Sequence, residues 1–225
     1  MHIPITRYGL PQVLAYPALI LALMALLFIF LPAGVPLAAS ETALLLILAW
    51  ALLFFRNPRR ESPADEKTLL SPADGTITDI SEADIPELGG KALRIGMFLS
   101  IFNVHINRMP CSVRVEEVRY KKGKFKNARS SESGRLNESN GVLLTRLAEP
   151  RDRLLLRQVS GAVARRIVCE AMPEQEYAQG AAFGMIKFGS RTELCLPFKE
   201  GGYDIAVKIG DKVQAGLSPL LTYKP

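Results

Sequence analysis

The stretch MIKFGSRTELCLP, from Met185 to Pro197, places a Gly-Ser pair at the start of a run in which apolar and polar residues alternate. Such alternation predicts a β-strand with one buried face. The pair itself, Gly189-Ser190, is compatible with a turn, with a serine nucleophile, or with a bond at which the chain cuts itself. A nucleophile elbow would read G-x-S-x-G, and this stretch lacks the second glycine.

Short stretches rich in Val, Ile, Leu and Thr lie before and after this strand, separated by Gly, Pro, Asp or Asn. Their length and spacing predict a mainly β (α+β) domain of the β-sandwich or barrel-sandwich type. A short helix is expected around residues 173–179, and IGDKVQAG (Ile209–Gly216) predicts a tight turn in a hairpin. The expected strands are Gly75–Ile80, Ala92–Ser100, Val113–Tyr120, Gly141–Leu147, Leu154–Val159, Arg165–Val168, Ala182–Ile186, Arg191–Leu196 and Tyr203–Ile209.

Two uncharged apolar runs precede this domain: YPALILALMALLFIFL (Tyr16–Leu31) and TALLLILAWALLFF (Thr42–Phe55). With their flanks, each approaches the about 20 residues that a membrane-spanning helix needs. Lys and Arg occur outside the pair but not in the loop that joins the runs, which predicts a hairpin with both ends in the cytoplasm. We expect a membrane anchor over residues 1–56 and a second domain over 57–225, at the inner membrane on its cytoplasmic side. The alternatives are a cleaved signal peptide followed by a core helix and a soluble hydrophobic hairpin. Whether the membrane hairpin spans the bilayer or is re-entrant stays open.

The formal net charge is +6, and residues 107–166 hold 15 Lys and Arg against 6 Asp and Glu. A basic bias of this kind favours an anionic partner, either nucleic acid or anionic lipid. Next to a membrane anchor, attraction to anionic headgroups is the better explanation of RYKKGKFKNAR (Arg119–Arg129), with a solvated loop as the alternative. No nucleic-acid partner is expected.

Cysteine and histidine are scarce in this chain. The three cysteines are widely spaced and form no CxxC, which predicts free thiols and no structural zinc site. His105 lies in GMFLSIFNVHINRMPC (Gly96–Cys111). A lone histidine in an apolar run is usually a packed residue, but the polar neighbours Asn103, Asn107 and Arg108 are unusual for a plain strand. Asp74 lies in Pro-Ala-Asp-Gly, which is good turn chemistry and means little alone.

Three motifs occur in order along the chain: SPADG (Ser71–Gly75), FNVHINRMP (Phe102–Pro110) and FGSR (Phe188–Arg191). From about Phe55 to the C-terminus, these motifs make the chain closely resemble the short form of the phosphatidylserine decarboxylases. An N-terminal membrane hairpin is also typical of that family. The resemblance implies an enzyme that converts phosphatidylserine in an anionic membrane to phosphatidylethanolamine and CO2. The same pattern includes RNP at Arg56–Pro58, YKKGKF at Tyr120–Phe125 and NESN at Asn137–Asn140.

The resemblance implies that the proenzyme cuts itself between Gly189 and Ser190. The 1–189 β chain and the 190–225 α chain then form a tight heterodimer, and a homo-oligomer of it is left open. The Ser190 hydroxyl attacks the Gly189 carbonyl, the ester eliminates, and hydrolysis leaves a covalent pyruvoyl group. Glycine permits the close approach and strained backbone of such a cut. The pyruvoyl carbonyl withdraws electrons from the Cα–carboxylate bond of the substrate, so no metal or diffusible cofactor is expected.

By the same resemblance, His105 takes part in decarboxylation as a proton donor, and Asp74 takes part in self-cleavage. Long-form enzymes carry a second histidine at the position of Arg108, so the base for self-cleavage is open between His105 and Asp74. Arg108, Arg191 and Phe188 are expected to bind substrate. A structural ion pair is the alternative for Arg108, and a solvated strand residue is the alternative for Arg191.

Two other classes of protein remain open from the residues alone. One is a membrane-tethered β-sandwich adaptor or carrier, although Lys187 fits the carrier lysine poorly. The other is a membrane serine hydrolase, which would lack its elbow motif. Self-cleavage distinguishes the decarboxylase from both. The sequence does not separate a diacyl lipid substrate from an ether-linked one.

Overall fold

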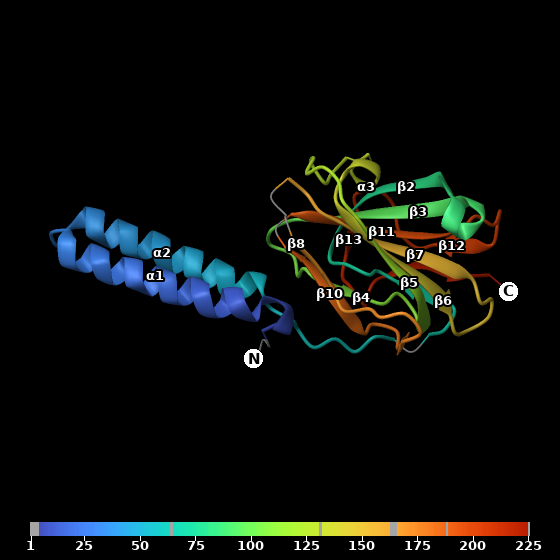
Figure 1. The fold of residues 1–225 in the computed structure, drawn as a ribbon, viewed down its shortest axis with the longest axis horizontal. Helices are drawn as coiled ribbons and strands as arrows, with labels where there is room; N and C mark the ends of the chain where they lie inside the picture. The colour runs from blue at the N-terminus through green and yellow to red at the C-terminus, as the bar shows by residue number, and fades with distance from the viewer. Residues whose placement is uncertain (1–4, 64, 131, 163–165, 188, 225) are drawn as a thin grey trace. The chain divides into compact units, whose positions relative to one another are not determined.

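The computed structural model describes residues 5–63, 65–130, 132–162, 166–187 and 189–224. The chain divides into two compact units, Met1–Arg59 and Arg60–Pro225 (Figure 1). The expected division after residue 56 lies close to this boundary.

The first unit is a helical hairpin (Figure 1). A 3-10 turn, η1 (Arg7–Gly9), leads into α1 (Leu10–Phe30), and α2 (Val35–Phe54) follows. Both helices carry a proline in their first turn, where its missing N–H would have no helical partner. Many large apolar side chains on both helices are exposed, which is unfavourable in water. Both helices are long and apolar enough to cross a membrane, a weak indication of membrane association that agrees with the predicted hairpin.

An eight-stranded antiparallel sheet is the largest element of the second unit (Figure 1). In spatial order its strands are β13 (Lys212–Val213), β2 (Gly75–Ile85), β3 (Gly90–Leu99), β11 (Ser190–Pro197), β7 (Arg153–Val159), β6 (Ser139–Arg146), β5 (Val113–Lys121) and β9 (Glu176–Tyr177). Two three-stranded sheets accompany it: β4 (Ile106–Arg108), β10 (Ala182–Lys187) and β8 (Arg166–Cys169), and β1 (Thr68–Leu70), β14 (Pro219–Tyr223) and β12 (Tyr203–Ile205). The short helices are η2 (Pro86–Leu88) and α3 (Ser133–Leu136).

The alternation along β11 determines which side chains enter the core. Leu194 and Leu196 belong to the main apolar cluster, which all three sheets supply. Cys195 belongs to a smaller cluster with Leu143 and Leu155. Because successive side chains of a strand point to opposite faces, Ser190 lies on the same face as Leu194, and Arg191 lies on the other. We call these the inner and the outer face of the large sheet.

The predicted mainly β fold with an N-terminal hairpin is confirmed, and so are the main strands, within a few residues at their ends. The helix expected around residues 173–179 is wrong. The Glu174 N–H donates to the Val115 carbonyl, and the Val115 N–H donates to the Gln175 carbonyl. These bonds add the segment to the edge of the large sheet as β9, so sheet pairing replaces local helix formation.

The closing hairpin is also only partly correct. A turn does occur at residues 209–210, where Gly210 adopts a φ of 97°. The strand after it, β13, pairs with β2, whereas β12 before it pairs with β14. The turn therefore carries the chain from one sheet to another.

Candidate active site

Ser190 is the first residue of β11 and lies on its inner face. Its side chain is fully buried, and its Oγ has no hydrogen-bond partner within the described ranges. Buried hydroxyls nearly always have a partner, because leaving one unsatisfied costs about 1–3 kcal/mol. A hydroxyl without a partner is available for chemistry, and stability alone does not account for a serine here.

The residue before it, Gly189, has a φ of 62°, in the left-handed region that favours glycine. The carbonyl of Gly189 packs directly on Gly161, so that a Cβ at position 161 would overlap the carbonyl oxygen. The two glycines thus have different reasons to be glycine. Gly189 allows the backbone conformation, and Gly161 leaves room for the carbonyl of the Gly189–Ser190 bond.

Hydrogen bonds hold the segment that contains Gly161. The buried Asn137 donates through Nδ2 to the Ser160 carbonyl at 2.8 Å and to the Lys126 carbonyl at 2.8 Å. The Ser160 N–H donates to the Glu138 carbonyl at 2.9 Å. Sequence reasoning quoted Asn137 only within a pattern and missed Gly161, whose signal is a glycine two residues after the end of a strand.

His105 lies between β3 and β4 and is fully buried. Its Nδ1 is 2.9 Å from the Asn103 carbonyl oxygen. A carbonyl can only accept, so Nδ1 carries the proton, and in the neutral imidazole Nε2 keeps its lone pair. The His105 carbonyl accepts from the Ile186 N–H at 3.3 Å, which places His105 beside the strand that leads to Gly189 and Ser190.

A row of buried polar side chains joins the segments that carry His105 and Ser190. Asn107, two residues after His105, donates to Thr192 Oγ1 at 3.0 Å. Thr192 lies two residues after Ser190 and on the same face of β11. Gln158 of β7 donates to Asn107 Oδ1 at 2.9 Å and so extends the row across the sheet. The structure therefore brings these two predicted site residues to the same part of the interior.

Asp74 lies in the turn before β2, and its carboxylate already has partners. Arg60 donates to it through Nη1 at 2.5 Å and Nη2 at 2.9 Å, and the Ala215 N–H donates at 2.8 Å. The end of β3 lies between Asp74 and Ser190, since Ser190 pairs with one edge of β3 and the start of β2 with the other. Two strand spacings, about 10 Å, separate the two backbones.

Arg108 is buried in β4, and it donates through Nη1 to the Gly180 carbonyl at 2.9 Å. Its backbone N–H donates to the Pro72 carbonyl at 2.9 Å, which ties β4 to the turn that holds Asp74. Phe188, also expected to bind substrate, lies outside the described residues. Both assignments remain predictions.

Arg191 follows Ser190 but lies on the outer face, fully buried. Its guanidinium donates to Glu193 at 2.8 Å, to Thr78 Oγ1 at 2.7 Å, and to Asp79. A Cβ on Gly96 would overlap this guanidinium, so the absence of a side chain there makes room for it. Arg191 is therefore not the solvated strand residue considered as the alternative, and its predicted contact with substrate stays a prediction.

Lys187, the last residue of β10, is a buried cation two residues before Gly189. Burial lowers the pKa of its ammonium group, and repulsion from Arg166 lowers it further. An anion bound nearby would relieve both effects, so Lys187 is a candidate for contact with an anionic substrate. Sequence reasoning had considered it only as a carrier lysine.

The cysteines are free, as expected, and burial raises the pKa of the Cys111 and Cys195 thiols to about 12. Among the residues that the structure describes, no group of three or more His, Cys, Asp or Glu side chains is placed to hold a metal ion.

A buried serine hydroxyl behind a left-handed glycine, with a buried histidine in the same interior, is an arrangement suited to serine-centred chemistry in a β-rich enzyme. A family match identifies the class of enzyme. The family model described as phosphatidylserine decarboxylase matches residues 47–220. The chain belongs to this family, and it is a decarboxylase.

Relatives match along nearly the whole chain. The phosphatidylserine decarboxylase proenzyme of Rhodopirellula baltica is 42% identical, over 99% of this chain and 89% of its own length. The proenzyme of Pelobacter propionicus is 40% identical, over 95% of this chain and 94% of its own. That of Syntrophus aciditrophicus is 37% identical, over 97% of both.

Proposed function

We propose that the chain cuts itself at Gly189–Ser190 and then, with a pyruvoyl group made from Ser190, converts phosphatidylserine to phosphatidylethanolamine and CO2. The observation that carries this proposal is the fully buried Ser190 Oγ, which has no partner among the described residues and follows the carbonyl of a left-handed Gly189 that packs on Gly161. The relatives are named proenzymes of a phosphatidylserine decarboxylase, which supports both the cut and the substrate.

Self-cleavage begins when Ser190 Oγ bonds to the Gly189 carbonyl carbon and loses its proton to a base. The C–N bond breaks, the nitrogen takes up a proton, and an ester joins the two residues. A base then removes the Ser190 α-proton, and the electron pair forms the Cα–Cβ double bond as the Gly189 carboxylate leaves. The resulting dehydroalanine tautomerises and takes up water, which releases ammonia and leaves a ketone at residue 190.

His105 is the base that we propose for the first step. Its Nδ1 proton is engaged by the Asn103 carbonyl, which leaves Nε2 as the proton acceptor of the ring. Asp74 is bound on both carboxylate oxygens by Arg60. We therefore assign Asp74 to holding the turn beside the site, with Arg60 neutralising its charge.

A pyruvoyl group at residue 190 would supply an electron-withdrawing carbonyl to the substrate amine, which would favour loss of the carboxylate as CO2. His105 then donates a proton to the carbon that has lost CO2. Lys187 contributes positive charge for an anionic headgroup. The site that holds these groups is buried, so it excludes water that would compete for that carbon.

The two fragments are expected to remain together, because the cut falls at the end of a central strand. All eight residues of β11 pair with β3, from Ser190–Leu99 to Pro197–Ala92, and β7 covers its other edge. The hairpin of the first unit would anchor this heterodimer at the cytoplasmic side of the inner membrane. The basic segment around residues 119–129 would attract anionic lipid there.

Denaturing mass spectrometry of the purified protein tests the proposal. We expect two chains, residues 1–189 and residues 190–225, the second lighter by one ammonia than a peptide that begins with serine. Incubation with phosphatidylserine should yield phosphatidylethanolamine and CO2. A single intact chain in material that carries out this reaction would disprove the pyruvoyl mechanism while leaving the enzyme assignment in place.

Replacing Gly161 by alanine is expected to slow self-cleavage by at least about tenfold, since displacing a reacting group by 1 Å can lower a rate about 100-fold. The added Cβ would overlap the Gly189 carbonyl oxygen and displace the carbonyl that Ser190 must attack. Gly141→Ala on β6 is the matched control, because a Cβ there comes no closer than 3.3 Å to another atom. The time course of fragment formation in freshly purified proenzyme measures both. Cleavage of Gly161→Ala at the wild-type rate would show that this contact does not position the carbonyl.

A further inference from the structure

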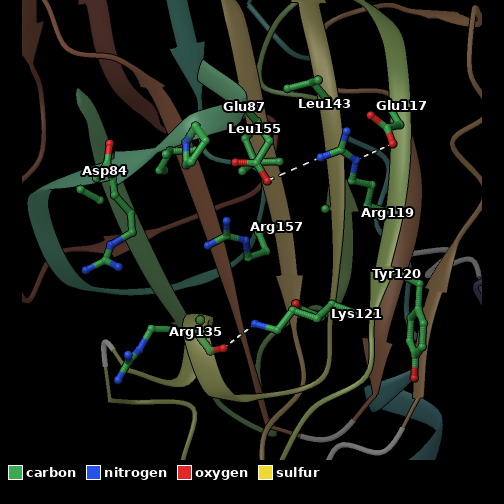
Figure 2. A pocket seen from close by; sticks show the side chains of 17 residues that line it. Asp84, Glu87, Glu117, Arg119, Tyr120, Lys121, Arg135, Leu143, Leu155 and Arg157 are labelled. Carbon is green, nitrogen blue, oxygen red and sulfur yellow. Dashed lines mark hydrogen bonds and ion pairs between the residues drawn. The ribbon is translucent and has the colours of Figure 1, made fainter. Parts of the chain in front are cut away.

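The outer face of the large sheet holds a cavity of about 440 Å³ (Figure 2). Leu143 and Leu155 line it, and both belong to the small apolar cluster on that face. Ser190 lies on the inner face, so the sheet itself separates this cavity from the candidate active site. The reaction proposed above assigns the cavity no role.

Cations gather at the end of the cavity next to α3. Figure 2 shows Lys121, Arg135 and Arg157 around this end. They come from β5, α3 and β7, so three separate elements place positive charge here. The Lys121 ammonium donates to the backbone carbonyl of Arg135, which holds it against α3, and the charges of Arg157 and Arg135 both act on it. The Arg135 guanidinium has no partner in the described part of the chain.

The carboxylate beneath these cations is already shared. Glu193 is fully buried and accepts from Arg157 at 3.1 Å and from Arg191 at 2.8 Å. Gly134 of α3 covers it so closely that a Cβ there would overlap its oxygens. Glu193 is therefore held by the two arginines, and its charge offsets only part of the effect on Lys121, whose pKa is lowered on balance.

Charge is balanced at the opposite end of the cavity. Arg119 forms an ion pair with Glu117. Its Nη1 also lies 3.9 Å from Oε1 of Glu87. Asp84 adds a further acid on that side (Figure 2). The excess positive charge is thus confined to the end near α3. The pKa of Lys121 agrees, since it is lowered by burial first and by repulsion from Arg157 next.

We propose that this cavity binds a phosphate-bearing anion, with the phosphate among Lys121, Arg135 and Arg157. Two guanidinium groups and an ammonium group offer several donors to phosphate oxygens, and Arg matches this geometry in a two-pronged way. An apolar portion of the ligand would lie over Leu143 and Leu155. The phosphate could belong to a lipid headgroup or be free in solution, and both present the same oxygens.

The first experiment uses the full-length protein in a non-ionic detergent and inorganic phosphate as the probe. Phosphate should raise the unfolding temperature in a saturable way beyond sodium chloride of equal ionic strength. The double variant Lys121→Gln, Arg135→Gln should weaken the apparent affinity by about tenfold or more, because each charge-assisted bond contributes about that factor. Both side chains are exposed at the surface, so the variant should fold. Lys122→Gln is the matched control and should behave as wild type.

A second experiment distinguishes a lipid headgroup from free phosphate as the ligand of the cavity. Short-chain phosphatidylglycerol, which carries no amine for the proposed decarboxylation, replaces inorganic phosphate at equal concentrations. Stronger protection by the lipid identifies a lipid headgroup as the ligand, and stronger protection by phosphate identifies a soluble one. Protection by neither probe, or protection that is equal in wild type and the double variant, overturns the proposal. These measurements of unfolding temperature do not depend on self-cleavage, so this proposal can fail while the proposed function holds, and the reverse.

Discussion

Replacing Ser190 by alanine is expected to leave one uncut chain and to abolish decarboxylation completely. Alanine keeps the burial and the strand pairing with Leu99 but removes the only atom of residue 190 that can attack the Gly189 carbonyl. Because Ser190 Oγ has no hydrogen-bond partner among the described residues, its removal leaves no other buried group unsatisfied. The variant should therefore fold at least as well as the wild type. Denaturing mass spectrometry and CO2 release from phosphatidylserine measure the two losses.

Ser81→Ala is the matched control, since Ser81 is a strand residue of the same sheet whose hydroxyl accepts from Arg94. It should cut and decarboxylate as wild type does. Appearance of the 190–225 fragment in Ser190→Ala would contradict self-cleavage by this hydroxyl. An uncut Ser190→Ala chain with wild-type activity would show that the fragment is not needed for the reaction.

The strands with strong alternation were predictable because their signal is local. The run after Ser190 carries its own periodicity, and β11 follows it to Pro197. The three-residue strand β4 gave no such signal, since it exists through pairing with β10. The segment at 173–179 shows the opposite error, because local composition favoured a helix and a sheet edge was available to it.

The residues of the candidate site likewise include some that the sequence predicts and some that it does not. Ser190, His105 and Asp74 could be named from ordered motifs, because their residue types are rare or distinctive in this sequence. The role of Gly161 depends on its contact with the carbonyl of Gly189, far along the chain, and no local pattern encodes that contact.

The outer-face position of Arg191 was predictable in principle, since it follows from the period of β11. Its partner Asp79 was not, because Asp79 comes from β2, beyond the intervening β3. Sequence patterns therefore located the reacting atoms better than the groups that hold them.

Replacing His105 by glutamine is the second change with a large expected effect. Glutamine can retain a hydrogen bond to the Asn103 carbonyl and similar size, but it has no basic nitrogen. Loss of a positioned general acid or base lowers a rate by about 10²–10⁴-fold. We expect a decrease of this size in the rate of self-cleavage and in CO2 release per mature chain. The amount of 190–225 fragment that lacks one ammonia gives the number of mature chains.

Asp74→Asn provides the comparison that separates the two proposed roles. It removes the charge that pairs with Arg60 and leaves His105 unchanged, so self-cleavage should slow less than in His105→Gln. If His105→Gln cuts normally and only its decarboxylation fails, the base for cleavage lies elsewhere, with Asp74 as the first candidate. If His105→Gln decarboxylates at the wild-type rate per mature chain, His105 is not the proton donor, and its burial beside β10 is a matter of packing.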